Sequence, residues 1–260
     1  FCCAIGYAGV KDKSVGLDPK YAISELHMDH WTYQDGLVSN HINSIYQTKD
    51  HFIWMTSYGG LQKFDGIDFS NFNPHNETSF KSSSVYDLFE GNDQNTWITT
   101  RSSGIVGYKN GKFFSYQHND SFPQSAMSLI ESSKGDFWIG TSNSGLYLKK
   151  NNGTFKQVSS IPEIRIRTIM EDDQGSIWVG TEGKGLYKIS KDSISRFSML
   201  DGLTSDIIWS LHLDTNGDVY VGTVNGLAIV RDGKVIKKPL FDGYEINDIL
   251  IDNYGSLWIA

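Results

Sequence analysis

The chain has 260 residues, of which 39% are apolar and 13% aromatic, and its formal net charge is −7. This apolar content is enough for a large core, and the lack of a block of like charges argues against nucleic acid as a partner. The two cysteines, Cys2 and Cys3, are sequence neighbours and predict no disulfide framework, and the seven scattered histidines predict neither a metal site nor a cofactor.

The N-terminal segment differs in character from the rest of the chain. Residues 1–20 are expected to be the tail of a secretory signal peptide or a disordered N-terminus, because the start is apolar and reaches the small-residue pattern "GYA" at 6–8. No stretch approaches 18 consecutive apolar residues, so the sequence predicts no membrane-spanning helix.

From residue 21 to residue 260 one pattern recurs: an aromatic residue in an apolar run, a Gly-Thr pair or its variant, a polar turn and a second apolar run. The aromatic residues at this place are Trp54, Trp97, Trp138, Trp178, Tyr220 and Trp258. A period of about 40 residues with short strands is typical of β-propeller blades. The sequence therefore predicts an all-β propeller of four-stranded antiparallel blades, with about five full repeats and a partial sixth from a seven-bladed ring.

The fourth repeat predicts the four strands of a blade, A to D, at residues 164–172, 176–181, 186–190 and 195–200. The flat aromatic residue on strand B is expected to fill the layer between blades, and the glycine two residues after it to leave room for the adjacent blade. Glycine also stands three residues before the aromatic residue in four repeats, where a turn favours positive φ. His51 and Gln94 replace it in the first two repeats, so those turns are expected to differ.

The two ends of the repeat region suggest a piece of a larger propeller. Residues 30–40 match residues 196–206, so the repeats are expected to begin with a lone outer strand. The chain ends inside the second strand of the sixth repeat. A closed ring needs the rest of that blade, so we expect a fragment of a longer polypeptide.

Candidate ligand-binding residues come from comparing the repeats with one another. The loops between strands D and A and between strands B and C are expected at one end of each blade, where function usually resides on loops. Strand A varies freely at its second position, and so does the first loop position after strand B, which is assigned to Ser57 in the first repeat. Such variation also suits an unconstrained surface. The candidates are Asn43, Tyr86, Arg101, Arg167, Glu182, Trp209 and Asn247.

The repeated segments resemble the two-component regulator propeller repeat. The resemblance rests on "DGLVSNHINSIYQTKDHFIWMTSYGGLQKFDG", "KGDFWIGTSNSGL", "DQGSIWVGTEGKGL" and "DNYGSLWIA" and covers about residues 30–260. It implies the periplasmic sensor part of a Bacteroidetes-type hybrid histidine kinase that recognises oligosaccharides and controls glycan-utilisation genes. It further implies that the rest of the polypeptide supplies more blades, an immunoglobulin-like domain, a membrane helix and the kinase, and that a homodimer is possible.

An enzyme is the alternative, because propeller glycoside hydrolases and lyases exist and "EDDQGSIW" superficially fits their turn motif. Glycoside hydrolysis needs two carboxylates across a cleft. Asp87, Glu182 and Asp248 are candidates, but the sequence places no pair of them together. The leading hypothesis is a sensor domain that is not itself an enzyme.

Overall fold

The computed structural model describes residues 29–116, 125–150, 153–252 and 254–260, so the segment 1–20 lies outside the described part. Within those ranges the chain forms β-strands and short 3₁₀ helices without any α-helix, which confirms the all-β prediction. None of the helices in these ranges has the length and apolar character to cross a membrane. The chain divides into two compact units, residues 1–126 and 127–260.

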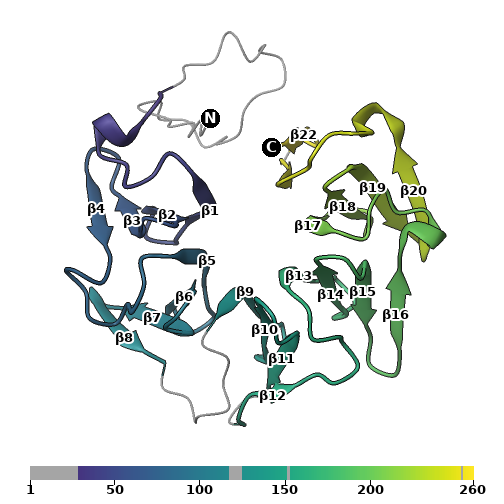
Figure 1. Cartoon of the computed structure of the whole chain (residues 1–260), viewed down its shortest axis with the longest axis horizontal. Coiled ribbons are helices and arrows are strands. Elements are labelled where there is room, and N and C mark those ends of the chain that lie inside the picture. The colour runs from purple at the N-terminus through teal and green to yellow at the C-terminus, as the bar shows by residue number, and fades with distance from the viewer. Residues whose placement is uncertain (1–28, 117–124, 151–152, 253) are drawn as a thin grey trace. The chain divides into compact units, whose positions relative to one another are not determined.

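Unit 1 contains two four-stranded antiparallel sheets whose strands follow one another in sequence order (Figure 1). The strands are β1 (Ile42–Gln47), β2 (Ile53–Ser57), β3 (Leu61–Phe64), β4 (Phe69–Phe72), β5 (Val85–Glu90), β6 (Thr96–Thr100), β7 (Ile105–Lys109) and β8 (Lys112–Ser115). The first strands of the two sheets, β1 and β5, lie against each other.

Unit 2 repeats this design, and β9 begins one residue before it. Its four-stranded sheets contain β9 (Ala126–Glu131), β10 (Phe137–Thr141), β11 (Leu146–Lys149), β12 (Lys156–Gln157), β13 (Ile166–Glu171), β14 (Ile177–Thr181), β15 (Leu186–Ile189), β16 (Ile194–Phe197), β17 (Ile208–Leu213), β18 (Val219–Thr223), β19 (Gly226–Arg231) and β20 (Lys234–Lys238). The sixth repeat contributes β21 (Ile249–Ile251) and β22 (Leu257–Ile259). The 3₁₀ helix η4 (Pro239–Phe241) follows β20. Each complete sheet is an antiparallel propeller blade, as predicted.

Both copies of the "DGL" loop form a capped 3₁₀ turn, η2 (Tyr33–Asp35) and η3 (Met199–Asp201). The side chains of Thr32 and Ser198 cap these turns in a capping box, which stops an extended strand at that residue. The fourth strand of the fourth repeat therefore ends three residues earlier than expected. Residues 30–32, at the start of the repeats where a lone outer strand is predicted, form no strand, and the residues before 29 lie outside the described part.

An equivalent backbone hydrogen bond closes the turn between strands A and B in all six repeats, including the two without glycine. The backbone N–H of His51 donates to the carbonyl of Thr48 at 2.8 Å, and that of Gln94 to the carbonyl of Gly91 at 3.0 Å. The φ angles of His51 and Gln94 are 68° and 61°, close to the 74° of Gly175. The prediction that these turns differ is therefore wrong, since the turn imposes left-handed backbone on whichever residue stands there.

We expect His51→Gly and Gln94→Gly each to raise the free energy of unfolding by up to about 1 kcal/mol. Left-handed backbone costs a residue with a Cβ about 1–2 kcal/mol, which exceeds the entropy that glycine adds to the unfolded chain. Urea denaturation of the two variants measures this change. Gly175→Ala is the matched control and should lower stability. A loss of stability in both glycine variants would contradict the account of these turns.

Four of the five repeated tryptophans lie in the cores of the blades, as predicted, and Trp258 is partly buried. Trp54, Trp138 and Trp178 are all buried. Trp178 packs in a cluster that joins the β13–β16 sheet to the β17–β20 sheet and includes Phe197 and Val230. The tryptophans are therefore explained by packing between blades.

The glycine two residues after the aromatic residue leaves room for the neighbouring blade, also as predicted. A Cβ at Gly180 would lie 2.5 Å from Cγ2 of Thr168 and 2.8 Å from Cγ2 of Ile208 on the next blade. A Cβ at Gly222 would lie 2.7 Å from Cγ2 of Ile246, which belongs to the next repeat. At these positions of unit 2 the glycine sets how closely neighbouring blades approach.

Candidate functional site

Strand A carries a β-bulge at its second residue in four repeats. The pairing with strand B shifts between the first and third residues of β1, β5, β13 and β17. The residues left out of the pairing are Asn43, Tyr86, Arg167 and Trp209. A bulge frees one residue from the hydrogen-bonded ladder and re-aims its side chain. The position that varies between repeats is thus the place where the backbone departs from the regular sheet.

The loops on either side of strand A meet at the end of the blade where these bulges lie. In the fourth repeat the backbone N–H of Glu182 donates to the carbonyl of Arg165 at 3.0 Å. The N–H groups of Gly183 and Gly185 both donate to the carbonyl of Asp206, at 3.0 and 2.9 Å. The B–C and D–A loops therefore share one end in unit 2, as predicted. We call this the loop end of the blades.

A threonine at the end of strand B closes the B–C loop in the second to fifth repeats, a role that the sequence analysis did not assign. In the fourth repeat Oγ1 of Thr181 donates to the carbonyl of Gly185 at 2.7 Å and accepts the N–H of Lys184 at 3.0 Å. The equivalent residues Thr100, Thr141 and Thr223 make the same pair of hydrogen bonds. The hydroxyl thus supplies a hydrogen-bond partner for a carbonyl and for an N–H group of the tight loop.

The same hydrogen bonds correct the alignment of the first repeat. Oγ of Ser57 donates to the carbonyl of Gly60 at 3.0 Å and accepts the N–H of Gly59 at 3.1 Å. Ser57 is therefore the counterpart of the closing threonine and ends β2, so its assignment to the first loop position is wrong by one residue. The misleading signal was Thr56, which stands at the glycine position of the Gly-Thr pair. The first loop residue is Tyr58, which is 59% exposed.

Three predicted residues come together at the loop end of unit 2. Arg167 on β13 lies over the ring of Trp209 on β17, with Cζ 5.1 Å from the ring centroid. Its Nη2 is 3.8 Å from Oε1 of Glu182 in the B–C loop. Arg165 joins them, with Nη1 2.9 Å from Oε2 of Glu182. We call Arg165, Arg167, Glu182 and Trp209 the arginine cluster.

The arginine cluster holds more hydrogen-bond donors than acceptors. The Nε atoms of Arg165 and Arg167 and Nε1 of Trp209 are buried and have no acceptor within the described ranges. The side chains of Arg165, Arg167 and Glu182 are nevertheless 42%, 33% and 30% exposed. Two guanidinium groups thus face one carboxylate at a surface that solvent reaches. Sequence reasoning missed Arg165, although the alternation "IRIR" places both arginines on one side of an extended chain.

The remaining candidates do not join this cluster. In unit 1 Nδ2 of Asn43 donates to the carbonyl of Val85 at 2.8 Å, so this side chain ties β1 to β5. Tyr86 meets Tyr58 edge to face, with ring centroids 6.2 Å apart.

Arg101 is exposed, and its backbone N–H donates to the carbonyl of Ser84 at 3.1 Å. Asn247 is exposed in unit 2, and its backbone N–H donates to the carbonyl of Ala260 at 2.7 Å. These backbone bonds hold Arg101 at the start of its loop and Asn247 two residues before β21.

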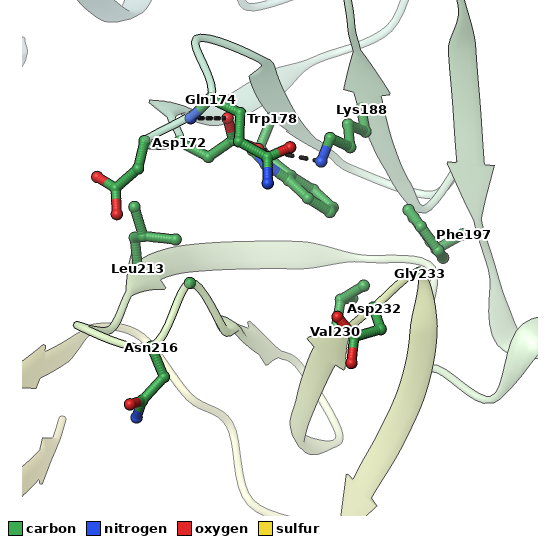
Figure 2. A pocket seen from close by; sticks show the side chains of 12 residues that line it. Asp172, Gln174, Trp178, Lys188, Phe197, Leu213, Asn216, Val230, Asp232 and Gly233 are labelled. Atoms are coloured by element: carbon green, nitrogen blue, oxygen red, sulfur yellow. Dashed lines mark hydrogen bonds and ion pairs between the residues drawn. The ribbon is translucent and has the colours of Figure 1, made fainter.

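A pocket of about 310 Å³ lies at the opposite end of the fourth and fifth blades (Figure 2). Asp172 and Lys188 line it, with 3.1 Å between Oδ2 and Nζ, and Nζ lies 4.8 Å from the ring centroid of Trp178. The other oxygen of Asp172 accepts the backbone N–H groups of Gln174 and Ser176, and Oδ2 also accepts the indole N–H of Trp178. The polar groups of this wall are therefore occupied in holding the A–B turn against the core. Within the described ranges no group of three or more His, Cys, Asp or Glu side chains is placed to hold a metal.

We expect Asp172→Ser to lower the free energy of unfolding by about 1.5 kcal/mol at neutral pH, since hydrogen bonds to a charged group are lost. Burial alone would raise the pKa of Asp172, but hydrogen bonds from Trp178, Ser176 and Lys188 lower it below its ordinary value. A carboxyl with a lowered pKa stabilises the fold above its unfolded pKa and loses that effect as the pH falls through its folded pKa. The difference between wild type and variant in urea denaturation should therefore shrink towards acid pH. A difference that grows on acidification would contradict this role.

The comparisons with known proteins agree with the fold. A family model described as the two component regulator propeller matches residues 36–59 and 160–183. No curated protein matches the chain by sequence. A solved streptogramin B lyase is similar over 90% of this chain and 80% of its own, with a TM-score of 0.72 and 14% identity.

Two other solved structures come from larger proteins. One is an extracellular domain assigned to a hybrid two component system of B. thetaiotaomicron, similar over 84% of this chain with a TM-score of 0.54 and 19% identity. The other is PorZ, a surface component of the type-IX secretion system of Porphyromonas gingivalis, similar over 85% with a TM-score of 0.65 and 15% identity. The chain spans 38% and 39% of their lengths. At these identities the likeness concerns the fold alone.

The two segments matched by the family model occupy equivalent places in the first and fourth repeats. Each runs from the loop that precedes strand A to the B–C loop, and so includes the bulge and the closing hydroxyl. Two segments of the chain therefore match the two component regulator propeller repeat, and the chain folds as four-stranded antiparallel blades of a β-propeller.

Proposed function

We propose that the chain is the ligand-sensing propeller of a two-component regulator, lies outside the cytoplasm and recognises an oligosaccharide at the loop end of its blades. One observation carries this proposal: bulges in four A strands re-aim a different side chain in each repeat at that end. In unit 2 two of these side chains, Arg167 and Trp209, belong to the arginine cluster. Aromatic rings suit the faces of sugars, and guanidinium groups suit their polar substituents.

The proposal assigns signalling to parts of the protein beyond this chain. Further blades, an immunoglobulin-like domain, a membrane helix and a histidine kinase would complete the regulator, and glycan-utilisation genes would be its targets. The repeats matched by the family model and the fold shared with the B. thetaiotaomicron domain support this placement. The chain itself would bind its ligand without transforming it.

Calorimetric titration of the chain with neutral, uronate and sulfated oligosaccharides tests the proposal. We expect one class to bind, and Arg167→Ala and Trp209→Ala each to weaken binding tenfold or more, about 1.4 kcal/mol. Asn216→Ala is the matched control, because Asn216 belongs to the pocket at the opposite end of the same two blades. Weaker binding in this control alone would show that the loop end is the wrong site.

Two further outcomes would contradict the proposal as a whole. One is the absence of binding throughout the panel. The other is cleavage of an oligosaccharide that disappears in Asp248→Asn or Asp87→Asn, which would identify a hydrolase or lyase. Chromatography of the titrated mixtures detects such products.

A further inference from the structure

Glu182 occupies the position that an acidic ligand would take in the arginine cluster. Its two oxygens lie 2.9 Å from Nη1 of Arg165 and 3.8 Å from Nη2 of Arg167. The first distance is a close ion pair, whereas the second exceeds hydrogen-bond length. Arg167 is thus charged, partly exposed and only loosely paired with the carboxylate that faces it.

The donors of the cluster outnumber what Glu182 can satisfy. Buried N–H groups without an acceptor are rare in folded proteins, and each one calls for a specific explanation. Here three such groups, on Arg165, Arg167 and Trp209, lie in one cluster. Because these three atoms are buried, a ligand meets the exposed part of the two arginine side chains, and a negative charge on the ligand balances their excess positive charge.

The geometry points to a planar carboxylate. Guanidinium groups bind carboxylates through two parallel N–H donors, and the resident group on these arginines is itself a carboxylate. The uronic acids of acidic glycans carry this group on a sugar ring.

We propose that this site recognises a uronate-bearing oligosaccharide, whose carboxylate takes the place of Glu182 on Arg167. This inference rests on the proposed function and adds the class of ligand. Glu182 is then an internal competitor, held near the arginines by its backbone bond to Arg165. The B–C loop that carries Glu182 is also hydrogen-bonded to Asp206 in the next D–A loop. Displacement of the Glu182 carboxylate by the ligand therefore acts on a contact between two blades.

The test is a calorimetric titration of the chain with trigalacturonate, triglucuronate, neutral galactotriose and sulfated galactotriose. We expect a uronate to bind at least tenfold more tightly than galactotriose, with affinity falling as salt is added. Glu182→Gln should tighten uronate binding about tenfold, because the internal anion is removed while the size of the side chain is kept. Arg167→Gln should weaken uronate binding by a similar factor.

Glu163→Gln is the matched control, because it changes the net charge equally and Glu163 is bonded to Gln157 outside the arginine cluster. It should leave uronate binding unchanged. Equal tightening in Glu163→Gln and Glu182→Gln would mean that only net charge matters and would overturn the inference. Binding of galactotriose or its sulfated form without a uronate would also overturn the inference while the proposed function stands. If no sugar binds, the proposed function itself fails.

Discussion

Replacement of Trp178 by alanine lowers the free energy of unfolding by about 3–5 kcal/mol, the usual cost of truncating a large aromatic core residue. Trp178 is 3% exposed and stacks on Phe197, with ring centroids 5.7 Å apart. Its indole N–H also donates to Asp172 at 2.8 Å. Alanine would remove the packing between two blades, leave a cavity and strip Asp172 of a donor.

Equilibrium denaturation in urea, followed by circular dichroism, measures this cost. Trp178→Phe is the control that keeps an aromatic ring in the layer between the blades, and it should cost clearly less than alanine. A loss below about 1 kcal/mol for Trp178→Ala would show that the residue is not part of the core.

Replacement of Thr181 by valine lowers the free energy of unfolding by at least about 2 kcal/mol. Valine keeps the branched shape but loses the hydroxyl that bonds the carbonyl of Gly185 and the N–H of Lys184. Thr181 is completely buried, so water does not replace the lost partner at its side chain. Urea denaturation again gives the magnitude.

Serine at position 181 is the natural control for this prediction. The first repeat uses Ser57 at the equivalent place, with the same two hydrogen bonds. Thr181→Ser should therefore retain most of the stability that Thr181→Val loses. Equal losses in the two variants would mean that the methyl group, rather than the hydroxyl, is what matters.

The blades were predictable because their pattern is repeated and physically simple. A buried tryptophan followed by a glycine recurs wherever one sheet packs on the next, as Trp178 and Gly180 show. Comparison of the repeats also showed that the second position of strand A varies. It did not show that this position is a β-bulge, because a bulge depends on pairing between two strands and requires no fixed residue type in the sequence.

The wrong or missing predictions concern local features that depend on hydrogen bonds and contacts formed only in the folded chain. His51 adopts a positive φ that a sequence normally signals with glycine, because the turn around it is already fixed by its hydrogen bond to Thr48. Ser57 is predicted in the loop rather than at the end of β2 because serine takes the place of the closing threonine, where only a hydroxyl is needed. Arg165 was overlooked because it precedes β13, and only the folded loop brings Glu182 to it.

The most direct test of the recognition surface uses the indole N–H signals of the chain's seven tryptophans. A ¹⁵N-labelled sample is titrated with the uronate and neutral trisaccharides, and the signals of Trp209 and Trp178 are assigned from Trp209→Phe and Trp178→Phe. Trp209 lies in the arginine cluster at the loop end, whereas Trp178 lies beside the pocket at the opposite end. We predict that the Trp209 signal moves on titration and the Trp178 signal does not. Movement of Trp178 with Trp209 unchanged would place recognition at the other end of the blades and contradict the account.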